Sequence, residues 1–314
     1  MSIKRKPLPL ANGPVFLTDG GMETTFIFHE GLELPEFSSL VLIKSEDGRQ
    51  AIAKYAKTYI DLARDAGLGL VIESTTWRAG PDWADKIGFP GLDNLAGANR
   101  DSIALLDEMR REAAKMDVNV IVSACIGPRG DGYDPGRIMT GEEAALYHDW
   151  QVRVLAETNA DVITGLTMTN VPEAIGIATA AKLHDMPCVI SFTLETDGRL
   201  PTGDSLEGAI VAVDAATGDA PAYYMINCAH PTHLIKSLDL PADIRERLRG
   251  IRANASKCSH AELDEMEELD VGNPHELGRE MADIHAAHPH IRVLGGCCGT
   301  DDRHVREIAK ALMF

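Results

Sequence analysis

The sequence predicts an α/β protein, a single (β/α)8 TIM barrel domain that covers residues 1–314. Eight short β-branched runs alternate along the chain with eight longer stretches of helical periodicity. Strands that are each followed by a helix pair in parallel through right-handed crossovers. The chain length of 314 residues also suits this fold.

The expected strands follow one another at regular intervals: Val15–Asp19, Gly69–Glu73, Val118–Ala124, Asp161–Gly165, Cys188–Leu194, Tyr223–Asn227, Gly250–Asn254 and Arg292–Gly296. In the first expected helix the apolar residues recur at helical spacing, at Ile52, Tyr55, Ala56, Tyr59, Leu62, Ala63 and Ala66. The remaining expected helices are Asn94–Lys115, Gly141–Thr158, Val171–Leu183, Ser205–Thr217, Pro231–Arg247, Pro274–Ala287 and Asp302–Met313.

An open doubly wound sheet is the alternative arrangement of the same elements. Such a sheet requires a glycine-rich phosphate-binding turn after its first strand. Here the first strand is followed by Asp19-Gly20-Gly21-Met22-Glu23, which lacks the G-x-G-x-x-G spacing. The barrel is therefore favoured.

Charge and hydropathy exclude several classes of partner. The formal net charge of −18 repels phosphate backbones and anionic membranes, so we expect neither as a ligand. No segment approaches the roughly 20 apolar residues that span a bilayer. The basic residues near the start are interrupted by Pro7, Pro9, Asn12 and Gly13, which does not fit a signal peptide. We expect a cytoplasmic protein, a monomer or small homo-oligomer, that acts on small molecules.

Six cysteines are present, and in a reducing compartment they are expected to be thiols or metal ligands rather than disulfides. Three of them follow predicted strands: Cys228 ends the sixth, and Cys297 and Cys298 end the eighth. Since the carboxyl ends of barrel strands meet at one mouth, these thiols should converge there. Three thiolates suit Zn²⁺ and leave a fourth position for substrate. From spacing alone, a core role is equally open.

Several motifs favour the metal site, because in order along the chain they resemble the homocysteine S-methyltransferase family. They are Asp19-Gly20-Gly21-Met22-Glu23-Thr24, Gly127-Pro128, Ser191-Phe192-Thr193, Asp197-Gly198-Arg199-Leu200, Ile226-Asn227-Cys228-Ala229-His230-Pro231 and Gly295-Gly296-Cys297-Cys298-Gly299-Thr300. The resemblance implies zinc ligation by the three cysteines. It also implies methyl transfer from an onium donor, such as S-methylmethionine, S-adenosylmethionine or betaine, to homocysteine, which forms methionine.

The same resemblance suggests roles for other residues. Asp19, Gly20 and Gly21 match the motif that holds the amino-acid part of the acceptor, and Thr24 lies close behind it. Asn227 precedes a cysteine ligand and is a candidate for orienting the site, or a plain polar strand end. Two residues are candidates for binding the donor. They are Trp77, whose ring offers a cation–π surface or simple packing, and Asn254, which matches an asparagine after strand seven.

One departure from the family pattern bears on the acceptor. The family usually has a glutamate after strand four that binds the acceptor ammonium group, and here Leu166 occupies that position. An ammonium ion buried without a counter-charge is costly. Either Glu195, Glu73 or Glu23 replaces the missing acid, or the acceptor is a different thiol or a selenol. A non-catalytic zinc- or thiol-binding member of the family is the remaining alternative.

Overall fold

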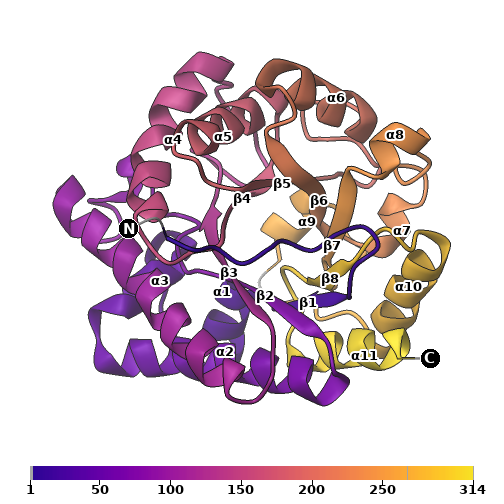
Figure 1. Cartoon of the computed structure of the whole chain (residues 1–314), viewed down its shortest axis with the longest axis horizontal. Helices are drawn as coiled ribbons and strands as arrows, with labels where there is room; N and C mark the ends of the chain where they lie inside the picture. Colours follow the sequence, from indigo (N-terminus) through magenta and orange to yellow (C-terminus); the bar gives the residue numbers. More distant parts are fainter. Residues whose placement is uncertain (1–2, 267, 314) are drawn as a thin grey trace.

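Eight parallel strands close into a barrel in the computed structural model, which describes residues 3–266 and 268–313 (Figure 1). They are β1 (Phe16–Thr18), β2 (Gly69–Glu73), β3 (Val120–Ile126), β4 (Val162–Met168), β5 (Cys188–Thr193), β6 (Pro221–Ala229), β7 (Leu248–Ala253) and β8 (Val293–Gly296). The strands follow chain order around the ring, and β8 closes it by pairing with β1 through Phe16 opposite Val293. The predicted TIM barrel is confirmed.

Helices form the outer ring (Figure 1). The long ones are α2 (Glu46–Ala66), α3 (Leu92–Ala114), α4 (Gly141–Ala156), α5 (Val171–Leu183), α6 (Leu206–Thr217), α10 (Pro274–Ala287) and α11 (Asp302–Leu312). Shorter helices are α1 (Met22–Thr24), α7 (Pro231–Leu234), α8 (Ala242–Arg245) and α9 (His260–Asp264), a π turn at Thr25–His29, and 3-10 turns at Pro35–Phe37, Ser39–Lys44 and Pro81–Trp83. Among the described residues, no helix combines the length and apolarity needed to cross a membrane.

One predicted helix is wrong. The segment Pro231–Arg247 was expected to be continuous, but it contains only the short helices α7 and α8 with a non-helical connection between them. Pro241 explains the break, because proline has no backbone N–H to donate and clashes with the preceding helical turn. In the structure Pro241 is the N-cap of α8.

The barrel interior is divided into an apolar layer and a polar layer. The apolar layer lies near the amino ends of the strands and consists of Phe16, Val71, Ile121, Val162, Val189, Tyr223, Met225 and Val293. Toward the carboxyl ends, buried charged residues replace it, among them Glu73 and Arg252. This is the end at which TIM barrels carry their chemistry.

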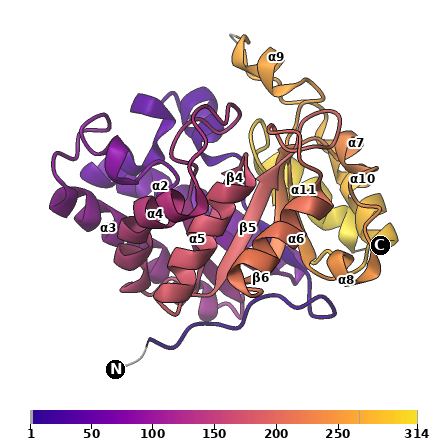
Figure 2. The ribbon, with the colours of Figure 1, turned by 90° about the horizontal axis from the view of Figure 1, so that it is seen from above.

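A segment that we call the N-terminal strap (residues 3–13) crosses the opposite end of the barrel (Figure 2). Leu8 packs against the apolar layer. Arg5 donates hydrogen bonds to the carbonyl groups of Ala156 and Ala160, and the Lys6 backbone N–H donates to Asp161 Oδ1 at 2.8 Å. The strap therefore covers the amino end of the barrel, which leaves the carboxyl end for a binding site.

Candidate functional site

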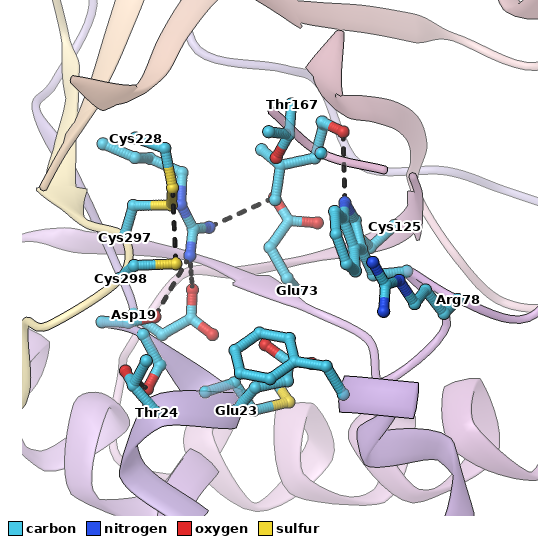
Figure 3. Close-up of a pocket in the computed structure, with 18 of the residues that line it drawn as sticks. Asp19, Glu23, Thr24, Glu73, Arg78, Cys125, Thr167, Cys228, Cys297 and Cys298 are labelled. Atoms are coloured by element: carbon cyan, nitrogen blue, oxygen red, sulfur yellow. Dashed lines mark hydrogen bonds and ion pairs between the residues drawn. A yellow bond between two sulfur atoms is a disulfide. The ribbon is translucent and has the colours of Figure 1, made fainter. Parts of the chain in front are cut away.

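A cavity of ≈ 310 Å³ lies at the carboxyl ends of the strands (Figure 3). Its volume falls at the lower end of the range for small-molecule sites. Its lining comes from segments far apart in sequence, at the ends of β1, β2, β3, β4, β6, β7 and β8, and includes Asp19, Glu23, Phe37, Glu73, Trp77, Arg78, Tyr133, Leu166, Arg252 and the three predicted ligands Cys228, Cys297 and Cys298. Closure of the barrel thus gathers the predicted residues at one mouth.

The three cysteine sulfurs converge as predicted. The Sγ atoms of Cys228, Cys297 and Cys298 all lie within 4.8 Å of one another. However, Cys228 and Cys297 are joined by a disulfide, so the prediction that no cysteine forms one is wrong for this pair. The physical reason is the convergence itself, because sulfurs held close enough to share a metal ion can also bond to each other when oxidised. Cys298 keeps a free thiol, 3.5 Å from the Cys228 sulfur.

A bulge in β6 turns Cys228 toward the cavity. The pairing of β6 with β7 shifts register between Asn227 and Ala229, and Cys228 between them has φ = +54°. A bulge adds one residue to a strand and re-aims its side chain, and positive φ in a residue other than glycine costs about 1–3 kcal/mol. A second bulge, in β4, gives Thr167 a φ of +64° and lets both Leu166 and Thr167 line the cavity.

The loop that carries Cys297 and Cys298 packs tightly against the turn after β1. A Cβ atom at Gly21 would lie 2.7 Å from the Cys297 carbonyl oxygen, and one at Gly296 would lie 1.9 Å from Thr300 Oγ1. Gly299 has φ = +75°, a conformation that favours glycine. These glycines are what allow two adjacent cysteines to reach the cavity.

The donor set fits a soft metal ion. Burial raises the pKa of the Cys298 thiol, and the Tyr133 hydroxyl, 3.4 Å from its sulfur, acts in the opposite direction. A buried thiol with a raised pKa stays protonated at neutral pH unless a cation stabilises its thiolate. Once Cys228 and Cys297 are reduced, three thiolates from two strands could hold one tetrahedral ion with a fourth position open.

Buried charges lie beside the cysteines. The Arg252 guanidinium forms an ion pair with Asp19 Oδ1 at 2.7 Å and a longer one with Glu73 Oε1 at 3.4 Å. Arg252 Nε also donates to the Gly296 carbonyl oxygen at 3.1 Å, which ties the guanidinium to the cysteine loop. Desolvation lowers the pKa of Arg252, but the two carboxylates outweigh it and the pKa lies above its ordinary value. The guanidinium is therefore a permanent charge in the cavity floor.

Most of the predicted substrate-binding residues line this cavity. Asp19, Gly20, Gly21 and Thr24 form its wall after β1. Thr24 Oγ1 donates to the Gly21 carbonyl oxygen and accepts from the Gly299 N–H, so Thr24 also links the two loops.

Trp77, a predicted donor-binding residue, also lines the cavity. Its indole Nε1 donates to the Leu166 carbonyl oxygen at 3.2 Å. Its ring already has the Arg78 guanidinium 5.0 Å from the centroid. The residue thus has a packing role in addition to any contact with a ligand.

Asn227 lies behind the cavity wall and is fully buried. Its Oδ1 accepts from the Thr167 N–H at 2.9 Å and from Ser191 Oγ at 2.7 Å. Its Nδ2 donates to Thr167 Oγ1 at 2.8 Å and points at the Cys297 sulfur at 3.7 Å. Asn227 therefore connects both bulged strands to the Cys297 sulfur, and its role in orienting the site stays a prediction.

The structure places Glu195 and Asn254 away from the main cavity. Both line a smaller neighbouring recess together with Cys258 and His260. Glu195 is 2.9 Å from His260 Nδ1, while His260 Nε2 is 2.8 Å from the Cys228 carbonyl oxygen. These residues lie behind Cys228 and do not line the main cavity, so the substrate-binding role of Glu195 and the donor-binding role of Asn254 stay predictions.

Sequence reasoning missed two residues of the site. Arg252 was not predicted as a site residue, although an arginine within an apolar strand is a signal of a buried ion pair. Tyr133 lies in the long connection between β3 and α4, where no periodicity predicts which side chain turns inward. Its ring stacks on His260 with centroids 4.0 Å apart.

Comparisons with known proteins agree with this arrangement. The family model for homocysteine S-methyltransferase matches residues 16–312. A selenocysteine Se-methyltransferase of Brassica oleracea var. italica is 25% identical over 98% of this chain and 92% of its own. Homocysteine S-methyltransferase 4 of Zea mays is 26% identical over 96% of this chain and 90% of its own.

Solved structures show the same fold. The metallated form of the homocysteine methyltransferase MmuM from Escherichia coli superposes with a TM-score of 0.71 at 18% identity, over 95% of this chain and 96% of that chain. Its oxidized form gives a TM-score of 0.72 at 19% identity, over 94% of each chain. With the family match over nearly the whole chain, these comparisons establish that the protein is an S-methyltransferase belonging to the homocysteine S-methyltransferase family.

Proposed function

We propose that this protein is a zinc-dependent enzyme that transfers a methyl group from an onium donor to the thiol of homocysteine and so forms methionine. The donor would be S-methylmethionine, S-adenosylmethionine or a betaine-like compound. The observation that carries the proposal is the convergence of three cysteine sulfurs within 4.8 Å at the wall of a small-molecule cavity. We place the activity in the cytoplasm, where thiolate ligands persist.

The reduced forms of Cys228, Cys297 and Cys298 would hold Zn²⁺, which stabilises an acceptor thiolate at neutral pH. In support, the E. coli protein of the same fold has a metallated form. The acceptor sulfur attacks the donor methyl carbon in line, a new S–C bond forms, and the bond to the positively charged sulfur or nitrogen breaks. The electron pair goes to that heteroatom, which leaves as a neutral group, and the thiol proton goes to solvent.

The remaining cavity residues favour a cationic substrate. Asp19, Glu23, Glu73 and Asp131 place four carboxyl groups in the lining, and two arginines, Arg78 and Arg252, only partly balance them. Aromatic rings at the cavity add surfaces that attract a methylated cation. The chain's own contribution is therefore to bring the donor methyl and the acceptor sulfur together in a cavity lined by acidic side chains.

Methylation of a selenol is the second candidate. It is favoured by the similarity, over nearly the whole chain, to a selenocysteine Se-methyltransferase. The same site chemistry serves both acceptors, because a selenolate is a soft nucleophile like a thiolate.

Methyl transfer can be measured directly. Reduced, zinc-loaded protein is incubated with each of the three donors and with homocysteine or selenocysteine, and the methylated products are quantified by mass spectrometry. We expect one donor to give methionine and a chelator to abolish the reaction. Methylation of selenocysteine in large excess over homocysteine would favour the second candidate, and no product from any pair would reject both.

A further inference from the structure

Glu73, at the end of β2, lines the cavity and has a buried carboxylate oxygen that lacks a hydrogen-bond partner among the described residues. The residue is 4% exposed and lines the cavity, yet its Oε2 has no hydrogen-bond partner in the part of the chain that the structure describes. Its Oε1 is 3.4 Å from Arg252. A buried carboxylate left without partners is costly, so this oxygen is a position where a ligand would gain free energy.

Arg252 does not fully neutralise the Glu73 carboxylate, because its guanidinium group has other and closer partners. The guanidinium is closer to Asp19, at 2.7 Å, and also donates to the carbonyl groups of Gly20 and Gly296. Desolvation raises the pKa of Glu73 to about 7, Arg252 acts against it, and Asp19 adds to it. A hydrogen bond from the Ser123 hydroxyl, which is also paired with Thr164 at 2.6 Å, lowers the pKa. One positive charge thus faces two acids, and a cationic group bound beside Glu73 would stabilise its charged form.

The other acids near the cavity already have partners. Ser39 Oγ donates to Glu23 Oε1 at 2.7 Å, Asp131 is paired with Arg78 at 3.3 Å, and Glu195 lies in the neighbouring recess. At the end of β4 the cavity wall is formed by Leu166 and Thr167, neither of which carries a charge. In the view of Figure 3, Glu73 lies between the cysteine cluster and Arg78, in the middle of the lining.

Resting on the proposed function, we propose that the Glu73 carboxylate accepts hydrogen bonds from the ammonium group of an amino-acid acceptor whose thiol or selenol reaches the cysteine site. An ammonium group carries N–H donors that satisfy an oxygen without a partner, whereas a quaternary ammonium donor such as betaine has none. The sulfonium donors carry an α-ammonium group of their own, so the binding of acceptor and donor has to be compared directly. The acid lies on β2, and β4 contributes the uncharged side chains of Leu166 and Thr167 to the cavity.

Calorimetry on the full-length, reduced and zinc-loaded protein tests the assignment. Homocysteine is compared with 4-sulfanylbutanoate, which has the same thiol and carboxylate but no amino group. The wild type should bind homocysteine about 10- to 100-fold more tightly, as expected for a hydrogen bond between charged groups. In Glu73→Gln this preference should disappear, with the affinity for 4-sulfanylbutanoate and the zinc content unchanged.

Two matched variants serve as a control and as a rescue. Glu23→Gln removes another acid of the same cavity and should keep the preference. The double variant Glu73→Gln/Leu166→Glu moves the acid from β2 to β4 and should restore it. A preference that survives in Glu73→Gln, or that is absent from the wild type, overturns the assignment while thiol binding still supports the proposed function.

Two further outcomes show whether Glu73 binds the donor instead of the acceptor, and whether the proposed function itself holds. If Glu73→Gln weakens the binding of S-methylmethionine as much as that of homocysteine, the carboxylate serves the ammonium group of the donor and the assignment to the acceptor is wrong. If neither thiol binds the zinc-loaded wild type, the proposed function itself fails, and the assignment fails with it.

Discussion

At the scale of single residues, Cys298 is the most informative of the three site cysteines, because it is the one outside the disulfide. We predict that Cys298→Ser lowers zinc affinity by more than the ~10–100-fold typical of losing a residue that only orients a ligand. Cys258→Ser, a half-buried thiol of the neighbouring recess, is the matched control and should bind zinc normally. Zinc bound per chain, measured after reduction, decides between them. Equal loss in both variants would remove Cys298 from the ligand set.

A second prediction concerns the effect of Glu73 on the pH dependence of stability. Its pKa is about 7 in the folded protein, above an ordinary value of 4.5, so protonation favours the folded state. That contribution is fully present below pH 4.5 and is lost as the pH rises through 7. Glu73→Gln has no proton to lose, so between pH 5 and pH 8 its stability should improve relative to the wild type, by on the order of 3 kcal/mol at most. Urea denaturation of both proteins in the same metal state measures this, and a difference that does not change with pH would contradict it.

At the scale of elements, the β6 bulge stores strain at Cys228, a proposed zinc ligand. Since Cys228 has φ = +54°, glycine should fit its backbone better than alanine. We predict that both Cys228→Gly and Cys228→Ala lose zinc, and that the glycine variant is more stable than the alanine variant by about 0.5–1 kcal/mol. Thermal melting of the two variants without metal makes the comparison. A more stable alanine variant would show that the bulge relaxes once the sulfur is removed.

The elements also show what sequence could and could not predict. All eight strands and most helices follow from periodicity, and the cysteine convergence follows from barrel closure, because both depend on local pattern and chain order. The bulges at Thr167 and Cys228 could not be predicted in this way, since these shifts of strand register do not alter the pattern of apolar residues along the chain. The ion pair between Arg252 and Asp19 joins strands that are far apart in sequence, so the local sequence around either residue does not predict its partner.

At the scale of the whole molecule, the two ends of the barrel have separate tasks. The N-terminal strap closes the amino end through Arg5 and Leu8, and the cavity occupies the carboxyl end. We predict that Arg5→Ala lowers stability by about 1 kcal/mol, because the carbonyl groups of Ala156 and Ala160 lose their donor. Zinc and homocysteine affinities should stay at wild-type values. A change in either affinity would show that the strap acts on the site.

The central claim is that three thiolates hold zinc and leave one position for the acceptor. Zinc K-edge X-ray absorption of the reduced, zinc-loaded protein tests it most directly, because zinc–sulfur distances of about 2.3 Å are distinct from those to nitrogen or oxygen. The account predicts three sulfur neighbours and one lighter atom without substrate, and four sulfur neighbours after homocysteine is added. A sulfur count that homocysteine leaves unchanged, or a first shell dominated by nitrogen and oxygen, would contradict the account.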